Sequence, residues 1–130
     1  MICFDKVSKR YATGQEALSG LTLNLDAGEM AFLTGHSGAG KSTVLKLVML
    51  MERPTQGQLL INGKNLGRLH RSQIPYYRRN VGVVFQNHQL LFDRTVFDNV
   101  ALPLLVSGYQ PREVGRRVRA ALDKVGLLDK

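Results

Sequence analysis

The sequence predicts an α/β fold in which short buried strands alternate with helices. Two apolar runs, residues 30–34 and 81–85, are short and almost uninterrupted, as is typical of strands covered on both faces of a parallel sheet. A third run, residues 21–25, alternates apolar and polar residues, which is typical of an antiparallel sheet with one wet face. We therefore expect a mixed core flanked by an antiparallel sheet.

The first half of the chain contributes the antiparallel strand at 21–25, the buried strand at 30–34 and then a helix. Within residues 43–51 only Thr43 and Lys46 are polar, so we expect this helix to be buried nearly all round. A glycine-rich loop of residues 35–43 leads into it. The expected order is strand, loop, helix.

The second half begins where Pro54–Gly57 breaks that helix. Residues 59–61 then predict a strand, and Asn62-Gly63 predicts a tight hairpin turn after it. From Val96 onward the pattern is helical, and Pro103 is expected to bend or end the first helix of this region.

Composition indicates one modest domain with a strongly basic charge. The 130 residues are 44% apolar and 22% charged, no run is long enough to span a bilayer, and Met1 is not followed by a secretory leader pattern. Cys3 is the single cysteine, which fits a reducing compartment.

The net charge of +8 comes largely from residues 68–79 and 112–124. The second segment has one apolar stripe and is typical of an amphipathic surface helix. Attraction to an anionic membrane leaflet or to nucleic acid is the alternative interpretation, and no motif for base recognition accompanies it.

The glycine-rich loop has the sequence Gly-His-Ser-Gly-Ala-Gly-Lys-Ser-Thr and matches the pattern G-x-x-x-x-G-K-S/T. Glycines at 35, 38 and 40 let the backbone curl, so that its N–H groups form a nest for phosphate oxygens. The positive end of the following helix adds to this attraction. The pattern predicts a phosphate-binding loop rather than a glycine-rich surface turn.

Two side chains of the loop carry chemistry. Lys41 supplies a mobile positive charge between the outer phosphates, and the Ser42 hydroxyl is a hard oxygen ligand suited to Mg²⁺. The residues predicted to bind the nucleotide here are Gly35, His36, Ser37, Gly38, Ala39, Gly40, Lys41, Ser42 and Thr43.

Together these features resemble the ATP-binding subunits of ABC transporters, over essentially all 130 residues. Such proteins place an aromatic ring that stacks on adenine where Tyr11 stands, although a plain sheet aromatic is an equal interpretation of Tyr11 alone. They place a glutamine that reaches Mg²⁺ and the attacking water where Gln86 follows the run at 81–85. Residues 54–57 and 95–104 also match the family pattern. The resemblance implies ATP and Mg²⁺ as cofactors, with Ser42 and Gln86 toward the metal.

Two stretches, residues 32–40 and 93–100, resemble family members that act in bacterial cell division. His36 and His88 belong to that match, and we assign neither a catalytic role because both fit ordinary loop or surface positions. The resemblance implies a P-loop NTPase fold of the ABC ATPase type, with an antiparallel β subdomain and the start of a helical subdomain.

The chain departs from the family in lacking an LSGGQ-type signature, an apolar strand ending in Asp-Glu and the later switch histidine. We therefore expect residues 1–130 to be the N-terminal part of one ABC-type nucleotide-binding domain, with an incomplete parallel core and no catalytic residue. Such a chain on its own should bind ATP weakly, turn over none and have low solubility.

The resemblance implies a peripheral subunit at the cytoplasmic face of the inner membrane, which docks a polytopic membrane protein near residues 87–105 and forms a homodimer through its nucleotide sites. Three alternatives stay open: the ATPase of an importer or lipoprotein-release system, a nucleotide-binding module without catalysis, and a nucleic-acid-binding protein that rests on charge alone.

Overall fold

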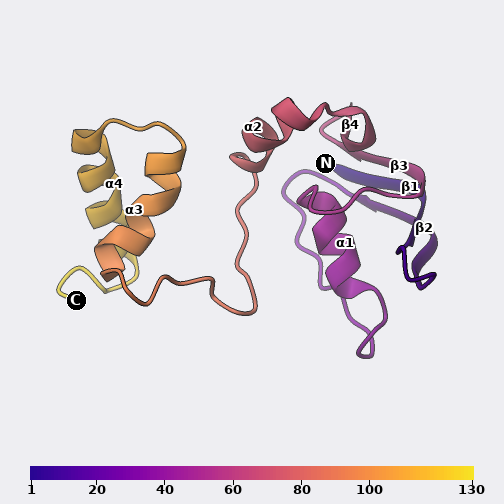
Figure 1. Ribbon diagram of the computed structural model, residues 1–130, viewed down its shortest axis with the longest axis horizontal. Coiled ribbons are helices and arrows are strands. Elements are labelled where there is room, and N and C mark those ends of the chain that lie inside the picture. The colour runs from indigo at the N-terminus through magenta and orange to yellow at the C-terminus, as the bar shows by residue number, and fades with distance from the viewer. The chain divides into compact units, whose positions relative to one another are not determined.

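The computed structural model describes all of residues 1–130, and the chain divides into two units, Met1–Gly82 and Val83–Lys130. The first unit contains every strand, and the second contains two helices (Figure 1).

The first unit is built on a four-stranded antiparallel sheet in the order β2-β1-β3-β4. The strands are β1 (Ile2–Arg10), β2 (Glu16–Leu25), β3 (Gln56–Ile61) and β4 (Lys64–Asn65). Asn62 and Gly63 both have positive φ, +48° and +76°, as a tight hairpin turn between β3 and β4 requires. The antiparallel sheet and this turn are confirmed, and β2 begins earlier than the alternation at 21–25 indicates.

Helix α1 (Lys41–Val48) contributes one face to the core of this unit. Val44 and Leu47 are buried in a cluster with sheet residues that include Phe4, Val7 and Leu59. The prediction of a helix buried nearly all round is wrong, because Leu45 on the other face is 57% exposed. Within this unit the sheet covers α1 on one side, and nothing buries the opposite side.

The carbonyl end of α1 is held by the segment that follows the sheet. This segment contains the 3₁₀ turns η1 (Leu66–Arg68) and η2 (Arg71–Gln73) and the helix α2 (Ile74–Arg78). The Tyr77 hydroxyl donates to the Val48 carbonyl at 2.5 Å, and the Arg78 guanidinium donates to the carbonyls of Met49 and Leu50 at 3.0 and 2.8 Å. These bonds satisfy carbonyls that the last turn of a helix leaves without partners.

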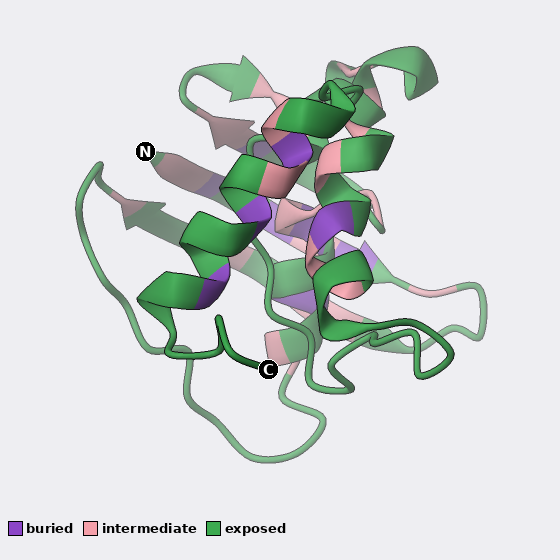
Figure 2. Cartoon of the chain, turned by 90° about the vertical axis from the view of Figure 1, so that its left-hand side faces the viewer, coloured by how far each residue is buried: buried purple, intermediate pink, exposed green.

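The second unit pairs α3 (Val96–Val106) with α4 (Pro111–Lys124). Their shared cluster consists of Ala101, Val114, Val118 and Leu122, and Figure 2 shows such buried positions as stripes along otherwise exposed helices. The amphipathic pattern of α4 is therefore confirmed. Pro103 lies inside α3 and does not end it.

The two apolar runs at 30–34 and 81–85 are not strands, which corrects the prediction of two buried strands. Met30 and Phe32 are 83% and 82% exposed, and Val84 is 97% exposed. A strand persists only where a neighbour completes its ladder of hydrogen bonds, and no strand of this chain pairs with either run. The expectation of an incomplete parallel core is confirmed, since every strand pair in residues 1–130 is antiparallel. None of the helices is both long and apolar enough to cross a membrane.

Candidate nucleotide-binding site

The phosphate-binding loop joins the run at 30–34 to α1, and its glycines take conformations that other residues rarely adopt. Gly38 and Gly40 have φ of +82° and +88°. A Cβ on Gly40 would lie 2.5 Å from the Ala17 carbonyl oxygen and 2.9 Å from Leu18 Cδ2. Glycine at 40 therefore lets the start of α1 approach strand β2 closely, which fixes the loop against the sheet.

The loop leaves several backbone N–H groups available. Within it, the Ala39 N–H donates to the His36 carbonyl at 3.2 Å, whereas the N–H groups of Ser37, Gly38 and Gly40 donate to no acceptor of the chain. The first-turn amides of α1 add to them, because a helix has no internal acceptor for its first N–H groups. These donors, with the positive helix end, suit a phosphate group.

Lys41 folds back over the loop. Its Nζ donates to the carbonyl oxygens of Gly35 and His36, at 2.6 Å each. These two carbonyls thus hold the ammonium at the loop. Ser42 is exposed and makes no side-chain hydrogen bond, so its hydroxyl is free to bind a metal ion. The His36 ring N–H (Nδ1) donates to the Ser37 carbonyl at 2.8 Å, which keeps the ring on the loop backbone.

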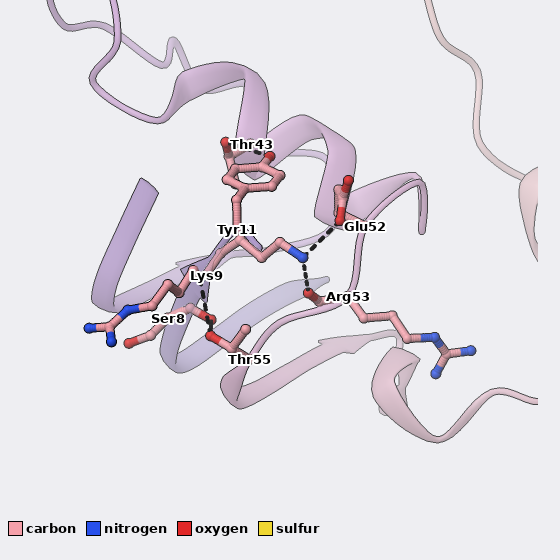
Figure 3. A network of polar contacts seen from close by, with 8 residues as sticks. Ser8, Lys9, Tyr11, Thr43, Glu52, Arg53 and Thr55 are labelled. Atoms are coloured by element: carbon pink, nitrogen blue, oxygen red, sulfur yellow. Dashed lines mark hydrogen bonds and ion pairs between the residues drawn. The ribbon is translucent and has the colours of Figure 1, made fainter. Parts of the chain in front are cut away.

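Tyr11 and the loop meet in one pocket of about 550 Å³. The Tyr11 hydroxyl lies 3.2 Å from Thr43 Oγ1, although the two residues are 32 positions apart in the chain (Figure 3). The pocket is lined by Tyr11, Thr13, Gln15, Ala17, Ser37, Gly38, Gly40, Lys41, Ser42, Thr43 and Lys46. The structure therefore brings together an aromatic ring, a set of free amides and two lysines.

Sequence reasoning missed part of this lining. Thr13, Gln15 and Ala17 come from the turn after β1 and the start of β2, where no motif marks them. Lys46 could have been found from the sequence, since it is one of only two polar residues in the apolar run at 43–51.

Gln86 belongs to the second unit and its side chain is exposed. Because the phosphate loop belongs to the first unit, the contact of Gln86 with Mg²⁺ stays a prediction. His88 is also exposed, with φ of +50°.

A protein-built metal site is absent, because no three His, Cys, Asp or Glu residues cluster in the chain. Mg²⁺ that binds with a nucleotide keeps phosphate oxygens and water as most of its ligands and needs few from the protein, since Mg²⁺ loses its waters reluctantly. The exposed Ser42 hydroxyl at the start of α1 is the ligand the loop offers. The free amides, Lys41 and Ser42 together fit a magnesium-bound phosphate chain.

The fold and the loop are those of an ATP-binding cassette. The pattern of the family described as "ABC transporter" matches residues 18–130, and the chain belongs to this family. A cassette solved as a dimer in a post-hydrolysis state, bound to ADP and Pi, matches 95% of the chain and 56% of its own length, with a TM-score of 0.84 and 31% identity. A component of an ABC transporter complex from Clostridium perfringens matches 97% of the chain and 50% of its own length, with a TM-score of 0.83 and 27% identity.

Among curated proteins, the chain is 55% identical over its whole length to the cell division ATP-binding protein FtsE of Escherichia coli K12. It is 45% identical to FtsE of Bacillus subtilis and 41% identical to the methionine import ATP-binding protein MetN of Aliivibrio fischeri, again over its whole length. The chain spans 59%, 57% and 39% of these three relatives.

Proposed function

We propose that residues 1–130 are the N-terminal part of an ABC-type nucleotide-binding domain, and that they bind Mg-ATP in the pocket between Tyr11 and the phosphate loop. The observation that carries this proposal is the pocket itself, which places an aromatic ring and a set of free amides within one 550 Å³ space. The ring stacks on adenine, while the loop amides and Lys41 hold the β- and γ-phosphates.

In this proposal Ser42 binds Mg²⁺ directly, and Gln86 is the second residue assigned to the metal. Phosphoryl transfer depends on positioning and electrostatic stabilisation, and Mg²⁺ supplies part of that stabilisation when bound. The general base and the signature motif have no counterpart in residues 1–130. The chain by itself is therefore proposed to bind ATP and to leave it unhydrolysed.

The whole protein is proposed to act in bacterial cell division. FtsE relatives at 45–55% identity support this role over import, because MetN is less similar at 41%. The subunit would sit peripherally at the cytoplasmic face of the inner membrane, form a homodimer through its nucleotide sites and drive an FtsX-like polytopic membrane protein.

The second unit supports docking of such a partner near residues 87–105. It holds an apolar pocket of about 620 Å³, lined in part by Leu90, Leu91, Phe92 and Val96. Phe92 is 95% exposed, so an apolar segment of the partner would remove a large ring from water.

The test of the nucleotide site is Lys41→Ala in the full-length protein. We expect loss of ATPase activity and weaker Mg-ATP binding, because the mobile charge at the outer phosphates is gone. Lys64→Ala, at an exposed lysine of β4 far along the chain from the loop, is the matched control and should behave as the unaltered protein. Unchanged ATPase activity in Lys41→Ala would overturn the assignment.

Copurification from membranes distinguishes a role in cell division from a role in import. Recovery of a cell-division membrane protein supports the first role. Recovery of an importer permease instead would favour a MetN-like function.

A further inference from the structure

The chain buries two polar side chains, and both interact with Tyr11. Lys9 and Thr43 are only 8% and 7% exposed. Thr43 Oγ1 lies 3.2 Å from the Tyr11 hydroxyl, and the Lys9 ammonium lies over the Tyr11 ring, 5.1 Å from its centroid. Burying a polar group is costly unless it is paired, so such groups have a defined position.

The Lys9 ammonium has two hydrogen-bond acceptors. Its Nζ donates to Glu52 Oε2 at 2.7 Å and to the Arg53 carbonyl at 3.0 Å, as Figure 3 shows. Glu52 and Arg53 lie shortly after α1, so the pair ties the end of β1 to the chain that leaves the phosphate-loop helix. The ladder between β1 and β2 is irregular on both sides of Lys9, which lets this long side chain turn inward.

The Lys9 ammonium lies over the Tyr11 ring but is not part of the pocket lining. Tyr11 lines the 550 Å³ pocket with the phosphate loop, whereas Lys9 does not line it. The ammonium thus lies over the ring without lining the pocket. Cation–π attraction favours this placement. Thr43 fixes the hydroxyl end, and the Tyr11 N–H donates to the Gln15 carbonyl at 2.9 Å, which fixes the backbone.

We propose that Lys9 and Glu52 are positioning residues for base recognition: their ion pair holds the Tyr11 ring at the angle at which it stacks on the base of the bound nucleotide. This inference rests on the proposed function, because it needs a nucleotide in the pocket. It means that recognition of the base requires two residues that lie outside the phosphate loop. Affinity for the base depends on the Lys9–Glu52 pair, whereas affinity for the phosphates does not.

The test compares Mg-ATP with magnesium tripolyphosphate, which has the phosphates without a base, by calorimetry on the full-length protein. Lys9→Met keeps an unbranched side chain, one atom shorter, and removes the charge. We expect it to weaken ATP binding about fivefold, the size of one aromatic stacking contact, and to leave tripolyphosphate binding unchanged. In a Tyr11→Ala background Lys9→Met should cause no further loss, because its effect passes through the ring.

Two further variants sharpen the result. Lys9→Arg keeps the charge over the ring and should restore most of the ATP affinity. Arg10→Met removes a neighbouring β1 cation whose pair with Glu16 is exposed, and it should change neither affinity. Where Lys9→Met fails to fold, Glu52→Gln carries the test, since its side chain is 34% exposed and tolerates the loss of charge.

The inference is overturned if Lys9→Met weakens the binding of ATP and of tripolyphosphate equally. It is also overturned if the effects of Lys9→Met and Tyr11→Ala on ATP binding are fully additive. Lys9 would then be a structural residue. If Tyr11→Ala weakens ATP binding and Lys9→Met does not, the inference fails while the proposed function stands. If the unaltered protein binds neither ligand, the proposed function itself fails.

Discussion

Gly40→Ala tests the close approach of the phosphate loop to the sheet. The new Cβ would lie 2.5 Å from the Ala17 carbonyl oxygen, which is backbone and cannot swing aside, and 2.9 Å from Leu18 Cδ2. The φ of +88° adds about 1–2 kcal/mol for any residue with a side chain. Overpacking adds about 1–3 kcal/mol, so we expect a loss of about 2–5 kcal/mol in the free energy of unfolding.

Gly38→Ala is the matched control. Gly38 has nearly the same φ, +82°, but a Cβ at this position would meet no atom within 4 Å. Gly38→Ala should lower the free energy of unfolding by only about 1–2 kcal/mol, which is the cost of the positive φ. Urea unfolding of the full-length variants, followed by circular dichroism, measures the difference. Equal losses for the two variants would refute the contact between the loop and β2.

Tyr77→Phe removes the hydrogen bond to the Val48 carbonyl and should lower the free energy of unfolding, measured in urea, by about 1 kcal/mol. Tyr76 is 65% exposed, so Tyr76→Phe is the control and should leave the free energy of unfolding unchanged. Burial raises the pKa of Tyr77 above its ordinary value, so the folded state holds this proton more tightly than the unfolded state. The free energy of unfolding of the unaltered protein should therefore fall as the pH rises above about 10, and it should fall less in Tyr77→Phe. The 130-residue chain alone should bind a dye for apolar surface, because Val84 and Phe92 are 97% and 95% exposed, and a chain that melts cooperatively without binding the dye would contradict this.

Features with a local cause were predictable from the sequence. The alternation at 21–25 and the Asn62-Gly63 turn need only neighbouring residues, and both are present in the sheet. The loop pattern likewise indicated where α1 begins, since glycine conformations and the helix start are properties of adjacent residues.

Features that depend on distant partners were not predictable in the same way. The apolar runs at 30–34 and 81–85 indicate segments that require cover on both faces, but they do not state which strands provide it. A role of Tyr11 at the nucleotide site was expected only through the family resemblance, and its contact with Thr43 was not predicted. Lys9 over the Tyr11 ring was not expected at all, because nothing in the spacing of Lys9 and Glu52 indicates that they meet.

The residues proposed to bind the nucleotide and the glutamine proposed to sense the γ-phosphate belong to different units of the chain. Tyr11, the loop amides, Lys41 and Ser42 all lie in Met1–Gly82, so the ring and the loop that line the pocket belong to one unit. Gln86 lies in the other unit. The proposed nucleotide affinity should therefore depend on the antiparallel sheet and α1, and substitution of Gln86 should change it little.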